Sequence, residues 1–357
     1  MSKDVILDKY ARLYEIPNQL SRIGHDVDCY CLSYQSHANG VWSECDEVKK
    51  LKWHSKSYIG LSKAFILSYP FYLLELLSKN KPDIIIAASD IPHIIMGEWL
   101  AKKLEIPFVA DLYDNFEAYG QAKIPFMKFL FHRALSSAKL VSTTSYSLAE
   151  KIRKQYPDVL NVYPMPSVID KKIFKSGDKT LARKKLSLPL NQPLIGTAGG
   201  LTKMKGIADL FGAWEILKKK NDQACLILAG PTEDSTKLPD DDRVIYLGLL
   251  PHHDVVTLFQ ALDVGVLCIP DDEFGQYCFP QKAYEMLACK LKIVSSAIGD
   301  MKFLLDQKPK QLYCTGDAQD LADKIIFQLE STQQQDLPIL DWQDTLMGFD
   351  GYLKQLI

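Results

Sequence analysis

The segment VGVLCIPDDEFGQYCFPQKAYEMLACKLKIVSSAIG, residues 264–299, contains two apolar runs separated by a loop and a helix-like stretch. The runs VGVLCIP and KIVSSAIG are short and apolar, which is typical of parallel strands buried on both faces. The helix-like stretch QKAYEMLACK would connect them as one βαβ unit. A parallel α/β sheet is therefore predicted here. The loop at residues 271–280 would leave the carboxyl end of the first strand, where such sheets bind ligands.

The same alternation of strand-like and helix-like segments runs along the whole chain. In the first half the runs HDVDCYCLSY, DIIIAAS, PFVADLY and LVSTTS alternate with stretches such as IIMGEWLAKKLE and PFMKFLFHRALSSA. The second half repeats the pattern with LIGTAGG, ACLILAG and VIYLG. At 357 residues the chain is too long for one ordinary core. The α/β pattern predicts two Rossmann-like domains, each with a doubly wound parallel sheet.

Three segments are predicted along the chain. Residues 1–165 form the first Rossmann-like domain, residues 170–335 the second, and residues 336–357 a final helix that we expect to pack back on the first domain. The break is placed at NVYPMPSVIDKKIF, residues 161–174, because prolines gather there and proline disfavours helices and strand ladders. The first strand of the first domain is expected to be very short or missing, since only Val5, Ile6 and Leu7 precede the first helix.

Composition narrows the functional class and the location. Charged residues make up 24% of the chain and its net charge is -2, so there is no electrostatic footprint for nucleic acid. The eight cysteines include no C-x-x-C pair, which favours free thiols in a reducing cytosol. The opening MSKDVILDKY does not read as a signal peptide, and a cytoplasmic location is expected. The apolar segments at residues 64–77 and 125–133 are interpreted as buried helices, with peripheral contact at the inner membrane face left open.

Two stretches of the second half are candidates for binding an anion. After the loop at 271–280, the start of a helix offers backbone N–H groups, Lys282 offers a charge for a phosphate, and Glu285 can accept hydroxyls of a ribose. The alternative is an amphipathic helix with a solvated Lys–Glu face. The second stretch is GTAGGLTKMKG, residues 196–206, whose glycines permit close approach of a diphosphate to the backbone. A glycine-rich turn alone is weak support for a diphosphate site.

The first half offers polar loops after two strands. DLYDNFE, residues 111–117, follows the run PFVA, and its polar groups suit recognition of hydroxyls across a cleft. The alternative is an ordinary polar turn whose aspartate caps a helix. Asp90 follows DIIIAAS in the same way and is a weaker candidate. His252 and His253 lack a second ligand at a useful spacing, so no metal site is predicted and they are expected on the surface.

The motifs in the second half resemble those of a known family. The pattern FG, then P-x-K-x-x-E-M-x-A, then a strand ending in glycine resembles the donor-binding signature of the family 4 glycosyltransferases, which have the GT-B fold of two facing Rossmann-like domains. The stretch at 196–206 is similar to the family's G-R-L-x-x-x-K-G motif. Tyr277 stands where the family commonly has a second glutamate. Gly200 stands where it has an arginine, for which Lys203 is a possible substitute.

The resemblance implies a role for each matching residue. The donor-side residues are Gly199, Gly200, Lys203, Lys205, Phe274, Gly275, Gln276, Tyr277, Cys278, Pro280, Lys282 and Glu285, with Glu285 on the ribose and the lysines on the diphosphate. The acceptor-side residues are Asp90, Tyr113, Asp114 and Asn115. The candidate catalytic residues are Asp114 first and Asp111 second, with Lys205 and Lys282.

The implied reaction moves a sugar from a nucleoside diphosphate sugar to a hydroxyl of a glycan, glycolipid or other acceptor. The resemblance implies that the anomeric configuration is retained and that neither a metal nor a cofactor takes part, in cell-surface polysaccharide or glycolipid assembly. Two alternatives remain: a non-catalytic partner subunit of the same architecture, and a sugar-nucleotide epimerase, which would need an acid/base pair. A nicotinamide dehydrogenase is disfavoured because no G-x-G-x-x-G motif is present.

Overall fold

The computed structural model describes residues 5–7, 9, 11–33, 39–45, 50–57, 63–169, 171, 173–332 and 341–357. The chain divides into two compact units. Unit 1 comprises Met1–Ser167 together with Trp342–Ile357, and unit 2 comprises Val168–Asp341. The division falls within the proline-rich segment at 161–174, and the last helix of the chain belongs to unit 1. Both units have the predicted α/β class, with strands that are mainly parallel.

Unit 1 contains two sheets. The first has the order β1-β3-β2, with strands β1 Asp26–Ser33, β2 Gly40–Cys45 and β3 Lys50–Ser57; β1 and β3 are parallel, whereas β2 is antiparallel to β3. The second is wholly parallel in the order β4-β5-β6-β7, with strands β4 Ile85–Ala87, β5 Phe108–Leu112, β6 Leu140–Thr143 and β7 Val162–Pro164. Residues 5–7 form a turn, and α1 is the first regular element that the structure describes.

The two sheets of unit 1 share their apolar layers. On one side Val27 of β1 packs in the same cluster as Ile84 and Ile86, and on the other Tyr30 of β1 packs with Ile85. The edges of β1 and β4 therefore border the same core, although no ladder between these two strands is formed. Unit 1 thus has the Rossmann-like α/β character that was predicted, with its strands divided between two sheets.

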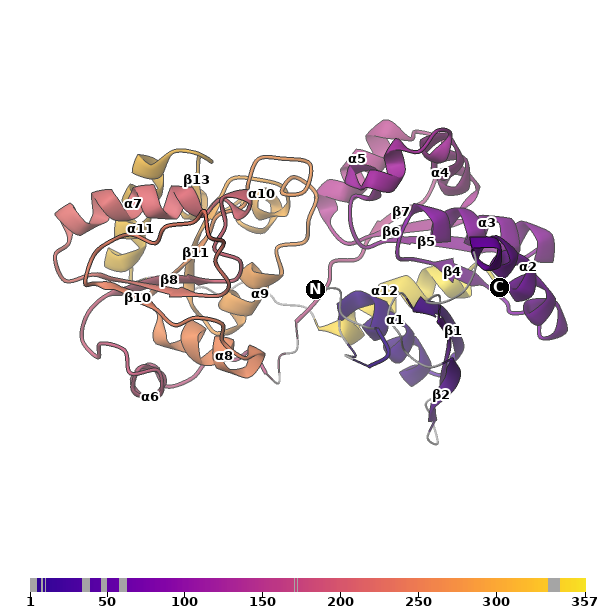
Figure 1. Cartoon of the computed structure of the whole chain (residues 1–357), viewed down its shortest axis with the longest axis horizontal. Coiled ribbons are helices and arrows are strands. Elements are labelled where there is room, and N and C mark those ends of the chain that lie inside the picture. Colours follow the sequence, from indigo (N-terminus) through magenta and orange to yellow (C-terminus); the bar gives the residue numbers. More distant parts are fainter. Residues whose placement is uncertain are drawn as a thin grey trace. The chain divides into compact units, whose positions relative to one another are not determined.

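The helices of unit 1 are α1 Ala11–Arg22, α2 Lys63–Lys79, α3 Ile91–Leu104, α4 Met127–Ser137, α5 Tyr146–Gln155 and α12 Trp342–Lys354, with the 3-10 turns η1 Phe116–Ala118 and η2 Gly120–Lys123. Figure 1 shows α12 beside α1, where Leu346 and Phe349 of α12 join Ile16 and Leu20 of α1 in one buried cluster. Burial of these side chains explains why a helix remote in sequence belongs to unit 1. Among the described helices, none is both long and apolar enough to cross a bilayer.

Unit 2 is one parallel sheet with the order β10-β9-β8-β11-β12-β13. Its strands are β8 Leu194–Ala198, β9 Cys225–Ala229, β10 Val244–Tyr246, β11 Val264–Leu267, β12 Lys292–Ser296 and β13 Leu312–Tyr313. Its helices are α6 Lys179–Lys185, α7 Ile207–Lys220, α8 His252–Ala261, α9 Gln281–Ala288, α10 Asp300–Leu304 and α11 Ala318–Glu330, with η3 Lys203–Lys205 and η4 Pro309–Gln311. Figure 1 shows α7 and α11 on one face and α8 and α9 on the other. Separate buried clusters around Trp214 and Phe259 fill these two faces, as the predicted doubly wound sheet requires.

The strand order of unit 2 reverses direction beside β8. From β8 the chain moves to β9 and β10 on one side, and then to β11, β12 and β13 on the other. The loops that leave the carboxyl ends of β8 and β11 therefore diverge. In doubly wound sheets this switch point is where ligands bind.

Candidate functional site

The loop after β8 lies very close to its neighbours. Gly199 has a φ of +127°, and a Cβ built there would stand 2.0 Å from the Nζ atom of Lys282. Gly230, after β9, has a φ of +129°, and its Cβ would stand 1.9 Å from the carbonyl oxygen of Gly199. The positive φ favours glycine at both positions, and at Gly230 the Gly199 backbone also leaves no space for a side chain. At Gly200, by contrast, a Cβ would meet only the Lys205 side chain, at 3.7 Å.

The loop after β11 folds on itself and returns to the loop after β8. The carboxylate of Asp272 accepts hydrogen bonds from the backbone N–H groups of Phe274 and Gly275, at 3.0 and 2.8 Å. A Cβ on Gly275 would stand 1.9 Å from the Pro270 carbonyl oxygen, so this turn also requires glycine. Phe274 meets Lys205, whose Nζ atom lies 3.9 Å from the centroid of its ring. Asp272 was missed in the sequence analysis, although an aspartate two residues before F-G is a recognisable turn signal.

Helix α9 begins where the second loop ends and carries Lys282 and Glu285. Glu285 is 6% exposed, and its Oε1 atom accepts a hydrogen bond from Gln281 Nε2 at 3.0 Å. The Nε2 atom of His252 lies 4.0 Å from the same carboxylate. Both contacts are made to Oε1, and the buried carboxylate is positioned to accept hydrogen bonds from a ligand. His252 is exposed, as the sequence predicted, but no spacing in the sequence indicates its approach to Glu285.

Lys282 is exposed as a residue, but its ammonium group lies against the backbone of Gly199. Desolvation of this group lowers the pKa of Lys282, Glu285 opposes that change, and the nearby charge of Lys205 reinforces it. An anion beside Lys282 and Lys205 would therefore stabilise the charged form of Lys282.

Unit 2 therefore brings together, at the carboxyl ends of β8 and β11, the predicted residues Gly199, Lys205, Phe274, Gly275, Lys282 and Glu285. Gly200 follows Gly199 in the same loop and Lys203 opens the exposed turn η3. Gln276, Tyr277, Cys278 and Pro280 lie in the loop after β11; the Cys278 thiol faces the Gly275 carbonyl oxygen at 3.8 Å, and Pro280 precedes α9.

Asp111 in unit 1 has a different role from the one predicted. It is 2% exposed, and its two carboxylate oxygens each lie 3.0 Å from Nε of Arg12 on α1. Ser142 of β6 donates a further hydrogen bond to it at 2.6 Å. Arg12 also donates to the Met165 carbonyl oxygen. Because the carboxylate is buried and fully engaged, its assignment as a catalytic residue is corrected to that of an ion pair that fixes α1 on the sheet.

Asp114 lies two residues after β5 and is half-buried. Its Oδ1 atom accepts from the backbone N–H of Asn115 at 2.7 Å, and its Oδ2 atom accepts from the Tyr119 hydroxyl at 2.7 Å. Burial, and then the Asp114 carboxylate, raise the pKa of Tyr119. Asp114 does not precede a helix as a cap, since Asn115 occupies that position before η1. Tyr113, also predicted, packs edge-on against Phe116.

Asp90 caps helix α3 and holds a histidine. Its Oδ1 atom accepts from the His93 backbone N–H at 3.0 Å and lies 2.6 Å from His93 Nδ1, while Gln121 Nε2 donates to Oδ2 at 3.1 Å. Burial alone would raise the pKa of Asp90, but the His93 contacts and Gln121 outweigh it and the pKa is lowered. Ser89, directly before it, has a φ of +97°, which is rare outside glycine. Asp90 and Asp114 thus organise the ends of β4 and β5.

Within the ranges described, the His, Cys, Asp and Glu side chains form no group of three or more that could hold a metal ion.

Both halves of the chain match models of known protein families. Residues 11–165 match the family model described as Glycosyltransferase Family 4, and residues 192–331 match the model described as Glycosyl transferases group 1. A putative teichuronic acid biosynthesis glycosyltransferase, TuaC of Bacillus subtilis, is 27% identical over 245 residues, which are 68% of this chain and 60% of that protein. The chain thus spans less than two thirds of the length of the curated relatives it matches first.

Solved structures share the fold. Sucrose-phosphate synthase from Thermosynechococcus elongatus superposes with a TM-score of 0.70 at 17% identity, covering 96% of this chain and 92% of that one. HepE from Anabaena, solved in complex with UDP, superposes with a TM-score of 0.64 at 20% identity, covering 78% of each chain.

Proposed function

We propose that this chain, which belongs to the family 4 glycosyltransferases, transfers a sugar from a nucleoside diphosphate sugar to a hydroxyl acceptor with retention of anomeric configuration. The observation that carries the proposal is the meeting of Lys205, Lys282 and Glu285 at the switch point beside β8. Two cations and one buried carboxylate within one loop cluster are complementary to a ribosyl diphosphate. The phosphates are anionic, and the ribose offers hydroxyl donors.

Each residue has a task in this proposal. Glu285 accepts hydrogen bonds from the ribose hydroxyls, and Gln281 keeps its carboxylate in place. Lys205 and Lys282 bind the diphosphate, together with the backbone N–H groups at the start of α9. Closed glycine turns at Gly199 and Gly275 allow the backbone to approach the ligand closely.

In the transfer step the bond between the anomeric carbon and the diphosphate oxygen breaks. A bond from the same carbon to the acceptor oxygen forms on the same face of the sugar, and the acceptor proton passes to the departing diphosphate. The leaving group gains negative charge in this step, and the two ammonium groups stabilise it without a metal or cofactor, by charge that is already in place. A lysine whose pKa is lowered in the free site gains most from an arriving anion.

The polar loops of unit 1 are proposed to serve the acceptor. Asp114, Tyr113 and Asp90 follow the carboxyl ends of β4 and β5, the edge at which parallel sheets present ligand-binding groups. Asn115, also predicted, is 2% exposed and its side-chain oxygen accepts from Lys151 at 2.8 Å, so it supports the loop and does not contact the acceptor. Of the two aspartates only Asp114 keeps the catalytic assignment, because Asp111 is occupied by Arg12. We propose a role in cell-surface polysaccharide or glycolipid assembly on the cytoplasmic side; the name of TuaC, which refers to teichuronic acid biosynthesis, supports the polysaccharide part of this proposal.

Peripheral membrane contact is part of the proposal for unit 1. The segments at 64–77 and 125–133 were expected to be buried, but each has an exposed apolar face among its described side chains. Phe126 is 79% exposed and Phe129 is 66% exposed; Lys128 directly precedes Phe129, and Lys123 lies three residues before Phe126. Aromatic side chains next to lysines suit the surface of an anionic bilayer.

Vesicle sedimentation tests this contact. Phe126→Ser with Phe129→Ser should release the protein from vesicles of anionic phospholipid. The matched control is Leu160→Ser, which removes an 87% exposed leucine from another part of unit 1. Equal binding by both variants would count against the contact.

The transfer proposal is tested by screening nucleoside diphosphate sugars for thermal stabilisation and then for transfer. UDP sugars come first, because HepE was solved with UDP. A bound donor at about 100 times its Kd should stabilise the fold by about 2.7 kcal/mol. The parent should also bind UDP better than 2′,3′-dideoxy-UDP, and Glu285→Gln should reduce this preference. Binding without transfer to any acceptor would favour the partner-subunit alternative, and absence of binding would contradict the proposal.

A further inference from the structure

A hollow of about 600 Å³ lies at the opposite end of the unit 2 sheet from the proposed donor site. It is lined by Leu190, Asn191, Gln192, Pro193, Asn221 and Gln223, which precede the amino ends of β8 and β9. Each of these strands has five residues, so the hollow is roughly 16 Å from the carboxyl edge. The hollow is open to solvent, since Leu190, Asn191 and Gln223 in its lining are exposed residues.

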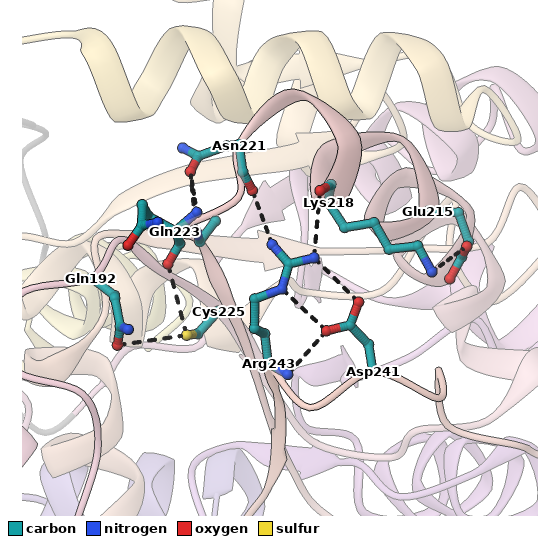
Figure 2. Close-up of polar contacts among 9 residues, drawn as sticks. Gln192, Glu215, Lys218, Asn221, Gln223, Cys225, Asp241 and Arg243 are labelled. Carbon is teal, nitrogen blue, oxygen red and sulfur yellow. Dashed lines mark hydrogen bonds and ion pairs between the residues drawn. The ribbon is translucent and has the colours of Figure 1, made fainter.

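The walls of the hollow are anchored by two arginines. Arg183, 4% exposed, donates to the carbonyl oxygens of Leu190 and Gln192 at 2.7 and 3.1 Å. Arg243 donates to the carbonyl oxygens of Asn221 and Lys218 at 3.2 and 3.4 Å and is paired with Asp241; Figure 2 shows this arrangement. The backbone of the segments that line the hollow is therefore held in place by hydrogen bonds from these two arginines.

The lining supplies hydrogen-bonding groups without charge. Asn221 Oδ1 accepts from the backbone N–H groups of Gln223 and Ala224, both at 3.1 Å, so its NH₂ group remains to donate (Figure 2). The Gln192 Oε1 atom has only the Cys225 thiol, at 3.9 Å. In the part of the chain that the structure describes, the side-chain amides of Asn191 and Gln223 have no partner. Each carboxamide offers both donors and an acceptor.

We propose that this hollow is a second binding site, for a neutral carbohydrate. A sugar hydroxyl both donates and accepts, as a carboxamide does, and Leu190 with Pro193 supplies an apolar surface for the C–H face of a ring. No lining residue is charged, which disfavours an ionic ligand, and none is aromatic, which disfavours a stacked base. The site does not depend on the transfer reaction. In a glycosyltransferase it would hold a glycan at a distance from the reacting atoms.

The test is binding of neutral oligosaccharides, followed by NMR of the side-chain amide groups. Maltotetraose, mannotetraose and galactotetraose are the probes, and oligogalacturonate is the charged comparison. At least one neutral probe should bind with a Kd on the order of 1 mM, as expected for a few exposed hydrogen bonds. It should shift the amide signals of Asn191, Asn221 and Gln223, with or without saturating UDP.

Two variants separate the site from other surfaces. Asn191→Ala with Gln223→Ala should weaken neutral binding about tenfold or more, while the matched control Gln319→Ala, on the exposed side of α11, should not. Thermal unfolding of each variant verifies that it is folded. The proposal is overturned if no neutral probe saturates, if the charged glycan alone binds, or if the double variant binds as the parent does. Binding that UDP competes away would place the sugar at the donor site and also overturn it.

Discussion

The ammonium nitrogen of Lys205 lies 3.9 Å from the centroid of the Phe274 ring. Lys205 ends the short turn after β8, and Phe274 lies in the loop after β11, so this contact joins the two loops at the switch point. A lysine over an aromatic face gains about 0.5–1 kcal/mol at an exposed site. Phe274 therefore positions a lysine that we assign to the diphosphate.

The first prediction follows from that contact. Phe274→Leu keeps an apolar side chain but removes the ring, so Lys205 loses its preferred position. Affinity for UDP should fall about two- to fivefold, corresponding to ~0.5–1 kcal/mol, while affinity for uridine should not change. Calorimetry with both ligands measures this. An equal loss for uridine would mean that Phe274 contacts the nucleoside instead.

The second prediction concerns the lysines and the absence of a metal from the proposed mechanism. Lys205→Ala and Lys282→Ala should each lower the transfer rate by about tenfold or more, because a charge-assisted contact is worth ~1.5–3 kcal/mol. Both lysines are exposed residues, so the unfolding temperature should change little. The parent's rate should persist in EDTA. A strict requirement for Mg²⁺ would contradict the assignment of the diphosphate charge to the lysines.

Local motifs made the donor edge of unit 2 predictable. Lys205 with Gly206, and Lys282 with Glu285, lie within single loops or helix turns, and their strands follow from short apolar runs. The doubly wound order then places the two motifs at one switch point. The contact between Lys205 and Phe274 joins two motifs that are far apart in the sequence. No periodic pattern predicts such a contact, so only the three-dimensional structure reveals it.

The sequence could not show which aspartate of unit 1 is available to a ligand. Asp111 and Asp114 both follow β5, and strand alternation does not reveal that Arg12, 99 residues away, occupies Asp111. Burial of an arginine on α1 is a tertiary feature, since α1 has no pattern that marks Arg12 as inward-facing until its neighbours are known. The same limit hid the anchoring of Asp90 by Gln121.

The third prediction concerns pH and the attachment of α12 to unit 1. Asp350, 8% exposed, lies 2.6 Å from His25 Nε2 and 2.7 Å from Lys354 Nζ. Burial would raise the pKa of Asp350, but these two partners outweigh it and the pKa is lowered. A carboxyl with a lowered folded pKa stabilises the fold above its unfolded pKa, about 3.9, and loses that effect as pH falls through the folded value.

Asp350→Asn should therefore destabilise unit 1 by about 1 kcal/mol at neutral pH. The difference from the parent should stay constant down to about pH 4 and shrink below it. Urea unfolding followed at several pH values measures this difference. Asp344→Asn, on the same helix, serves as the comparison. A difference that persists unchanged well below pH 4 would mean that Asp350 acts through packing and not through its charge.

The last prediction separates the acceptor loop from the donor site. Asp114→Asn keeps the side-chain shape, and its remaining oxygen can still accept from the Asn115 N–H, but the charge beside Tyr119 is lost. If Asp114 contacts the acceptor, transfer should fall by about tenfold or more while UDP affinity stays near that of the parent, because separate subsites contribute nearly additively. The conservative variant Tyr119→Phe tests whether the Tyr119 hydrogen bond alone matters; it should reduce transfer less than Asp114→Asn does.

Transfer rate and UDP affinity are measured on the same preparation of each variant. Transfer at the parent's rate in Asp114→Asn would remove Asp114 from the site, since a turn that only needs an oxygen acceptor tolerates asparagine. Loss of UDP affinity as well would mean that this loop also contributes to donor binding.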